Sequence, residues 1–253
     1  TLTTQQAGGF RQTQRETLTR LLDIFALHVD RHIVSRIAQN ISYTYLGREA
    51  GERVVSGTIK RGSGVSIRAI VWSSDMRDFS RLSERHDNRT VAEVLNSYFS
   101  VLAEAVIRHG GDVLKFVGDG MLAVFPIADF ASPKMAARAA ADAAQEAVQD
   151  LQTLNREMSQ TADWGPLQTG IGLHLGDVFF GNIGATMRLD FTVIGEAVNV
   201  ASRIEGLCKP LKRDVLMSAQ VAALLDEGVE PLGAQALKGM QKTEQLFGLA
   251  GGR

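Results

Sequence analysis

Apolar residues near the start of the chain recur at helical spacing. Between Thr17 and Tyr45 they follow one another at intervals of three or four positions, as Leu18, Leu22, Phe25, Val29, Ile33, Ile37 and Ile41. This periodicity is typical of a long amphipathic helix whose apolar stripe needs a partner surface. We therefore expect residues 1–46 to form an N-terminal helix that acts as a coiled-coil connector.

Glycines interrupt the pattern after this helix. They lie at Gly47, Gly51, Gly57, Gly62 and Gly64. Glycine-rich segments favour turns over regular elements. The sequence thus predicts a linker over residues 47–64 and a main domain over residues 65–253.

Short apolar runs and longer helical patterns follow in the main domain. Ile67–Trp72 predicts a strand, and the spacing from Val91 to Val106 predicts a helix. Val113–Val117 and Met121–Phe125 predict two strands joined by a glycine-rich turn, which together form a hairpin. A Ser-Pro start signal and an alanine-rich segment predict a helix over residues 133–158.

The second half of the main domain also contains both predicted strands and a predicted helix. Gln168–Leu175 and Asp177–Gly181 predict a strand pair, Arg188–Ile194 a further strand and Glu196–Leu207 a helix. Because strands and helices alternate irregularly, the pattern favours an α+β sandwich over a doubly wound parallel sheet.

Composition narrows the class of protein. The 253 residues, 45% of them hydrophobic, suffice for a full core. Since 27 basic residues balance 28 acidic ones, no overall charge favours a nucleic acid or an anionic membrane as partner. Cys208 is the sole cysteine, which excludes an internal disulfide and suits a reducing cytoplasm.

The hydropathy of the chain and its first residue lead to two further expectations, about membrane spans and about a longer parent protein. No run of 18 or more apolar residues appears, so no membrane-spanning segment is predicted. The sequence starts at Thr1 without a methionine or a signal peptide. We expect that it is excised from a longer protein with an upstream sensor or regulatory domain.

Two aspartates lie where predicted strands end. Asp75 follows the strand Ile67–Trp72 closely, and Asp119 lies between glycines at the hairpin tip. If these strands pair, both carboxylates come together and can share two hard cations. The alternative is that each aspartate only caps a turn.

The surroundings of these aspartates resemble the class III adenylyl and guanylyl cyclases. The stretch from Trp72 to Ser80, WSSDMRDFS, is similar to the family's first metal motif, and Leu114–Gly120, LKFVGDG, to its metal-binding hairpin. Phe191–Arg203, FTVIGEAVNVASR, resembles a third family block. The resemblance covers roughly residues 65–250.

This resemblance implies a fold and a metal site. The fold is a ferredoxin-like sandwich, with a central, mostly antiparallel sheet and helices, and the metal-binding positions are Asp75, Met76 and Asp119. Two Mg²⁺ or Mn²⁺ ions would assist attack of the ribose 3′-hydroxyl on the α-phosphorus of a nucleoside triphosphate.

Lys115 and Thr192 are the candidate base-reading pair. An ammonium can donate to adenine N1, and a threonine hydroxyl can accept from the adenine amino group, so the pair favours ATP over GTP. Lys and Thr together resemble the bacterial class IIIb subgroup, some of whose members respond to bicarbonate. Asp190 points to the same strand face as Thr192 and is a rival for the same role.

Other residues receive roles from the third block and its neighbours. Asn199 and Arg203 lie four apart on a predicted helix and therefore project from one face, where they can orient a ribose and neutralise phosphate charge. The resemblance makes them catalytic residues and adds Phe79 and Lys238 to the substrate-binding set.

The resemblance also implies a head-to-tail homodimer. Asp75 and Asp119 of one chain would face the base-reading and catalytic residues of the other, so that two equivalent sites arise. The expected product is 3′,5′-cyclic AMP, in signal transduction. Two alternatives stay open: guanylyl cyclisation, and a silent nucleotide-binding domain, because Asp78 and Met240 replace residues typical of the family.

Overall fold

The computed structural model describes residues 3–5, 7–57, 60, 62–158, 164–185, 187–240 and 243–250. These residues form two compact units, 1–57 and 58–253. The predicted boundary at residue 65 stays a prediction.

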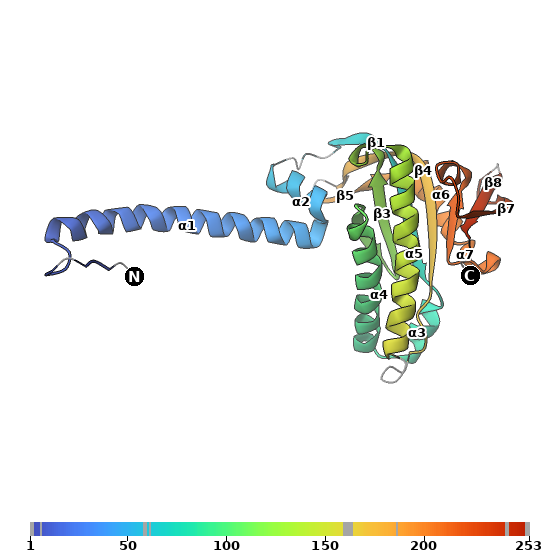
Figure 1. The fold of residues 1–253 in the computed structure, drawn as a ribbon, viewed down its shortest axis with the longest axis horizontal. Helices are drawn as coiled ribbons and strands as arrows, with labels where there is room; N and C mark the ends of the chain where they lie inside the picture. Colours follow the sequence, from blue (N-terminus) through green and yellow to red (C-terminus); the bar gives the residue numbers. More distant parts are fainter. Residues whose placement is uncertain are drawn as a thin grey trace. The chain divides into compact units, whose positions relative to one another are not determined.

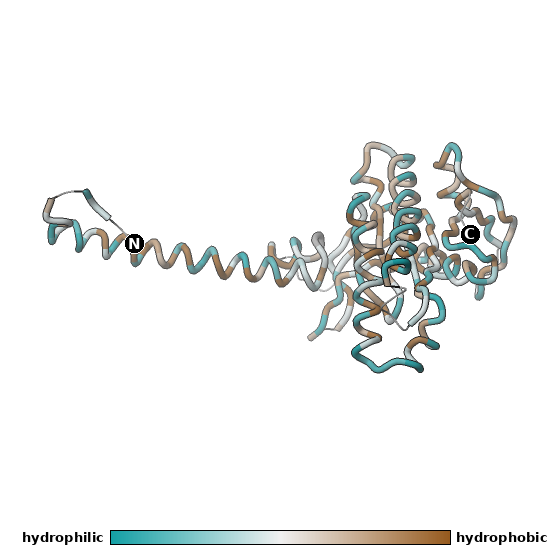
Figure 2. The backbone as a smooth tube through the Cα atoms, turned by 60° about the horizontal axis from the view of Figure 1, so that its bottom comes forward, coloured by the Kyte–Doolittle hydropathy of each residue, from teal (hydrophilic) through white to brown (hydrophobic). Residues whose placement is uncertain are grey.

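The first unit consists of two helices, α1 (Gln12–Leu46) and α2 (Arg48–Val55). No residue of α1 is buried, and its apolar residues recur along its whole length (Figure 2). Helix α2 lies inside the segment predicted as a linker. Gly51 permits this helix to approach α1 closely, because a Cβ there would lie only 2.5 Å from the Tyr43 ring.

The second unit is built around one sheet of eight strands among the described residues, in the order β2-β3-β1-β4-β6-β8-β7, with β5 paired to β4. The strands are β1 (Gly64–Met76), β2 (Asp112–Val117), β3 (Gly120–Pro126), β4 (Thr169–Ala185), β5 (Arg188–Ile194), β6 (Val215–Ser218), β7 (Val229–Ala236) and β8 (Thr243–Leu249). All strand pairs are antiparallel except β4 with β6. The α+β sandwich is thus confirmed.

Helices flank this sheet. They are α3 (Phe79–Arg85), α4 (Asn88–Arg108), α5 (Pro133–Met158), α6 (Glu196–Glu205), α7 (Cys208–Leu211) and α8 (Ala219–Ala222), with a short 3-10 helix at Ile127–Asp129. Figure 1 shows α4 and α5 side by side in front of β1 and β3. The core between them and the sheet includes Trp72, Tyr98 and Phe125, all fully buried.

Helix α4 is long and apolar enough to span a membrane by length and composition. Its buried residues, Val94, Tyr98, Leu102, Ala105 and Val106, belong to the domain core. The apolar character of α4 therefore has an explanation within the fold.

The structure corrects two predicted strands. The predicted pair Gln168–Leu175 and Asp177–Gly181 is a single strand, β4, because β1 pairs with it without interruption from Thr169 to Gly181. Gly176, interpreted as a break, lies inside this strand beneath α6, where a Cβ would approach Ala197 to 2.5 Å.

Candidate active site

Strand pairing brings the two predicted aspartates together. β1 and β3 are neighbours, and Asp75 at the end of β1 is paired with Gly120, the residue after Asp119. The backbone N–H of Met76 donates to the carbonyl of Asp119 over 3.2 Å. The predicted adjacency of these strand ends is confirmed, so both carboxylates belong to one edge of the sheet.

The two carboxylates repel each other. Partial burial, together with the charge of Asp119 and a hydrogen bond to it, raises the pKa of Asp75 to about 6. Glu205 on α6 adds a third negative charge in the neighbourhood, and burial raises its pKa to about 7, with Asp75 contributing. A cation at this edge would relieve the repulsion.

Gly120 leaves the space that the Asp75 side chain uses. A Cβ at residue 120 would lie 2.9 Å from the carbonyl oxygen of Ser74 and 3.2 Å from Oδ1 of Asp75. Any larger residue must therefore displace the strand end or the carboxylate.

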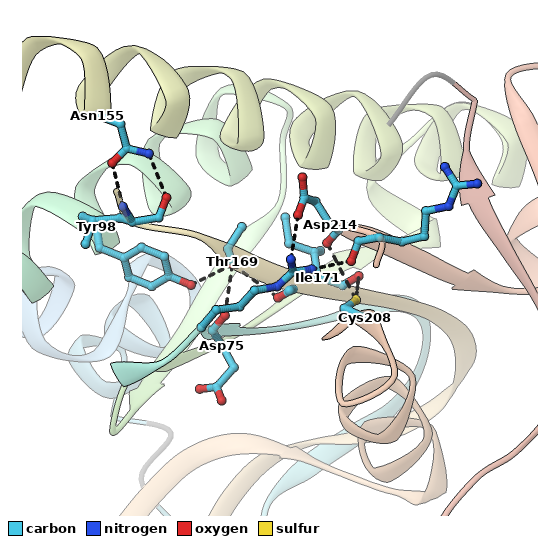
Figure 3. A network of polar contacts seen from close by, with 11 residues as sticks. Asp75, Tyr98, Asn155, Thr169, Ile171, Cys208 and Asp214 are labelled. Atoms are coloured by element: carbon cyan, nitrogen blue, oxygen red, sulfur yellow. Dashed lines mark hydrogen bonds and ion pairs between the residues drawn. The ribbon is translucent and has the colours of Figure 1, made fainter. Parts of the chain in front are cut away.

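A buried hydrogen-bond network fixes the backbone at Asp75 (Figure 3). The hydroxyl of Thr169 lies 3.3 Å from the carbonyl of Asp75 and 2.8 Å from the hydroxyl of Tyr98. Thr169 is 2% exposed. Since unpaired buried hydroxyls are costly, the network gives the end of β1 one defined position.

Lys115 and Thr192 lie on strands that approach each other. Lys115 Nζ is 3.7 Å from a carboxylate oxygen of Asp190 on β5, two residues before Thr192. Thr192 is 5% exposed, and its hydroxyl has no hydrogen-bond partner among the described residues. The predicted rival Asp190 thus contacts Lys115, while the Thr192 hydroxyl is buried without a hydrogen-bond partner among the described residues.

Phe116 follows Lys115 on the strand, and strand alternation predicts that it faces the core, but it is only partly buried. Its ring lies 4.4 Å from that of Phe99 on α4, but its side chain is 50% exposed. β2 is an edge strand and carries an irregularity between Val113 and Lys115. A bulge at an edge shifts side-chain directions, which explains the incomplete burial.

Helix α6 carries Asn199 and Arg203 as predicted. It packs closely on β4, because Gly172 has no side chain where a Cβ would lie 2.4 Å from the carbonyl of Ala201. Asn199 is exposed and Arg203 half-buried. The guanidinium of Arg203 lies beside Gly239, the neighbour of the exposed Lys238.

The loop between Asp75 and Phe79 contains an unusual residue. Asp78 adopts a φ of 58°, a left-handed conformation that explains why glycine is typical of the family at this position. Its carboxylate accepts from Lys209 Nζ over 2.6 Å. A hydrogen bond from Lys209 and the lysine's charge lower the pKa of Asp78. The half-buried Phe79 then begins α3.

Sequence reasoning missed three residues near this edge. No functional role was predicted from the sequence for Glu205 or Lys209. Arg77 binds Asp214 at 3.2 Å, which ties the loop after Asp75 to the start of β6. Their partners lie far away in the sequence, so no local pattern could have revealed them.

Comparison with known proteins decides the family. The family described as "Adenylate and Guanylate cyclase catalytic domain" matches residues 67–250. The chain belongs to this family.

Curated cyclases are among its relatives. Over 182 residues the chain is 32% identical to "Adenylate cyclase 1" of Rhizobium meliloti (strain 1021), covering 70% of this chain and 27% of the relative. It is 32% identical over 232 residues to "Adenylate cyclase" of Anabaena cylindrica, covering 85% of this chain and 45% of the relative. The chain thus spans less than half the length of these cyclases.

Solved cyclase structures share the fold. The adenylyl cyclase CyaB from P. aeruginosa has a TM-score of 0.68 at 26% identity, covering 76% of this chain and 97% of that chain. The guanylyl cyclase Cya2 has a TM-score of 0.64 at 28% identity, covering 75% and 95%. A bacterial light-regulated adenylyl cyclase, with a TM-score of 0.73 at 24% identity over 95% of this chain and 65% of that chain, shows the fold alone.

Cyclases of this family use divalent metal ions, and the residues at the sheet edge fit such ions. Asp75 and Asp119 supply hard carboxylate oxygens, the donors that Mg²⁺ prefers. Methionine has no side-chain oxygen, so only the backbone carbonyl of Met76 can serve as an oxygen donor. Among the described residues no cluster of three or more histidines, cysteines or acidic residues forms a metal cage.

Proposed function

We propose that this cyclase domain converts ATP to 3′,5′-cyclic AMP and pyrophosphate. The observation that carries the choice of ATP is the buried Thr192 hydroxyl without a partner, on a strand that lies beside Lys115. Lys115 would donate to adenine N1, and the Thr192 hydroxyl would accept from the adenine amino group. Guanine carries a hydrogen on N1, which an ammonium cannot accept.

Asp75, Asp119 and the carbonyl of Met76 would hold two Mg²⁺ or Mn²⁺ ions. When bound, these ions supply positive charge that lowers the pKa of the ribose 3′-hydroxyl and neutralises the triphosphate. The hydrogen-bonded backbone at Asp75 and the space that Gly120 leaves for its carboxylate support this role for Asp75. No separate general base is required.

The remaining site residues would act on the sugar and the phosphates. Asn199 would orient the ribose, and Arg203 would stabilise negative charge on the phosphoryl oxygens as pyrophosphate leaves. Lys238 would contact phosphate from the same side, because Gly239 brings its segment against Arg203. The backbone at Phe79 would approach the triphosphate.

Two copies of the domain would complete the site. Asp75 and Asp119 of one protomer would face Lys115, Thr192 and Arg203 of its partner across a head-to-tail two-fold interface. The exposed apolar stripe of α1 supports pairing with α1 of the second copy as a signalling connector. The greater length of the relatives supports an upstream sensor in a longer protein, with the catalytic part in the cytoplasm.

Guanylyl cyclisation is the competing function, supported by the similarity to Cya2. A silent nucleotide-binding domain is less well supported, because Lys209 neutralises the Asp78 carboxylate that would otherwise repel triphosphate. The deciding experiment measures cyclic nucleotide formation from ATP and from GTP with Mn²⁺ at several protein concentrations. Cyclic AMP formation that rises with dimerisation supports the proposal; preferential turnover of GTP, or nucleotide binding without product, contradicts it.

A further inference from the structure

A cavity of about 920 Å³ lies between α5 and the segment that joins α7 to β6. Its walls come from the second half of α5, the start of β4, residues 209–215 and the end of β8. The volume is that of a site for a small organic molecule. None of the residues to which we assign a role in cyclisation lines it.

The lining combines three kinds of group. Positive charge comes from Arg77, Lys209, Lys212 and Arg213, against the single acid Asp214. One face of α5 contributes a row of amides at helical spacing, Gln145, Gln149 and Gln152. Apolar surface comes from Val148, Leu151, Leu167, Val215 and Leu249. These groups suit an anionic headgroup on a largely apolar body with hydrogen-bonding edges.

The cations differ in how they are paired. Arg213 binds Glu230, Arg77 binds Asp214 and Lys209 binds Asp78. Lys212 has no acidic partner within ion-pair distance in the described part of the chain, and its φ of 52° is rare for a residue with a side chain. Nε of Arg77 is buried without a hydrogen-bond partner among the described residues. The cavity therefore retains positive charge that an anion can neutralise.

The cavity wall connects directly to the metal-binding loop. The Arg77 backbone N–H donates to Gln168, and its guanidinium donates to the carbonyl of Arg213 and pairs with Asp214. Thr169, also in the wall, contacts the carbonyl of Asp75. Figure 3 shows this continuous path from Asp214 to Asp75 beneath α5.

We propose that this cavity is an effector site for a small organic anion, a phosphate or carboxylate on an apolar body. The anion's headgroup pairs with Lys212 and draws Lys209 from Asp78. The released Asp78 carboxylate then opposes the triphosphate, so occupancy raises the KM for ATP. The effect on KM rests on the proposed cyclase function, whereas binding of the anion does not.

Binding is tested with 8-anilinonaphthalene-1-sulfonate, an aromatic sulfonate, followed by hydrogen–deuterium exchange on the full chain. The probe should slow exchange about twofold or more in peptides covering residues 145–156 and 208–215. In Lys212→Glu, the probe concentration needed for the same protection should rise about tenfold, because the substitution reverses the unpaired charge. Gln149→Trp, which fills the cavity from an exposed position, should remove the protection.

Lys134→Glu is the matched control, since Lys134 is an exposed lysine at the other end of α5. It should leave the protection unchanged. Absence of protection in the two segments of the wild-type chain, or equal loss in Lys134→Glu and Lys212→Glu, overturns the site. Probe bound only by α1 gives protection outside these segments and also counts against it.

Coupling is tested by kinetics. The probe should raise the KM for ATP about threefold or more in the wild-type chain and leave it unchanged in Lys212→Glu. An unchanged KM at a probe concentration that protects the cavity overturns the coupling. If the probe protects the cavity segments but the chain forms no cyclic nucleotide, the proposed function is contradicted and the binding site is still supported.

Discussion

The two halves of the candidate site differ in their electrostatic balance. At the edge formed by β1 and the β2–β3 hairpin, Asp75 and Asp119 repel each other, and the pKa of Asp75 is raised to about 6. On β2 and β5, Lys115 is partly neutralised by Asp190, while the Thr192 hydroxyl lacks a partner among the described residues. We propose that one half binds cations and the other binds a hydrogen-bonding ligand.

This difference separates the expected consequences of mutation. Changes at the acidic edge should affect metal binding, turnover and the stability of the metal-free protein. Changes at Lys115 and Thr192 should alter the choice of nucleotide more than the chemistry, because we propose that these side chains contact the base.

The largest effect is expected at Asp119. Asp119→Asn removes one of the two proposed metal-binding carboxylates and should reduce cyclic AMP formation with Mn²⁺ about 1000-fold or more. Asp129→Asn, a change at an exposed aspartate of the 3-10 helix, is the control and should retain full activity. Activity of Asp119→Asn within tenfold of wild type would exclude the proposed metal site.

Gly120→Ala should have the next largest effect. The added Cβ meets the Ser74 carbonyl and the Asp75 carboxylate and should displace this carboxylate. Because small misplacements in an active site slow the reaction, kcat should fall about 30-fold. Gly206→Ala is the control, because the nearest atom to a Cβ there lies at 3.6 Å, an ordinary van der Waals distance, and φ is −58°. Equal kcat values for both variants would show that space beside Asp75 is unimportant.

Exchange of the base-reading pair should change specificity. Lys115→Glu combined with Thr192→Ser supplies an acceptor for guanine N1–H and should shift the kcat/KM ratio of ATP to GTP by about 10- to 100-fold towards GTP. Parallel assays with both nucleotides measure the shift. A uniform loss for both nucleotides would assign these residues to structure.

Metal binding should depend on pH. Asp75 must lose its proton to bind a cation, so Mn²⁺ affinity should rise with pH through about 6 and fall roughly tenfold per unit below it. Isothermal titration of the nucleotide-free protein at pH 5 to 8 measures this. Glu205→Gln should leave the midpoint of this pH dependence near 6. Loss of the pH dependence in this variant would show that the titrating group is Glu205 and not Asp75.

The smallest effect concerns the stability of the metal-free protein. The raised pKa of Asp75 means that its ionisation disfavours folding, increasingly as pH rises from its ordinary pKa of 3.8 through about 6. Asp75→Asn removes this repulsion and should raise the Tm at pH 7.5 by about 2 °C. The difference should be smaller at pH 4.5 and should vanish below the ordinary pKa of 3.8, where Asp75 is protonated in both the folded and the unfolded chain. A lower Tm of Asp75→Asn at pH 7.5 would contradict the repulsion.

Local patterns predicted the elements that carry the acidic edge. Glycines around Asp119 and the apolar runs beside it predicted the hairpin correctly. Helical spacing predicted α4, the Ser-Pro signal and the alanine-rich segment predicted α5, and the pattern over Glu196–Leu207 predicted α6. The roles of the site residues, by contrast, came from the family resemblance and remain proposals. Amphipathic periodicity also predicted α1, although no buried surface accompanies it.

Features that depend on distant contacts could not be predicted. The length of β4 follows from its pairing with β1, which overrides the turn signal at Gly176. The ion pairs of Asp78 with Lys209 and of Arg77 with Asp214 join residues more than 130 positions apart. Only the folded chain brings these groups together.

The most direct test of a shared site mixes two inactive variants, Asp119→Asn and Arg203→Ala. If the aspartates of one copy act with the arginine of the other, a mixed dimer contains one intact site and one doubly altered site. Random pairing should then restore about a quarter of wild-type cyclic AMP formation. A mixture as inactive as each variant alone, although mixed dimers form, would contradict the two-chain site.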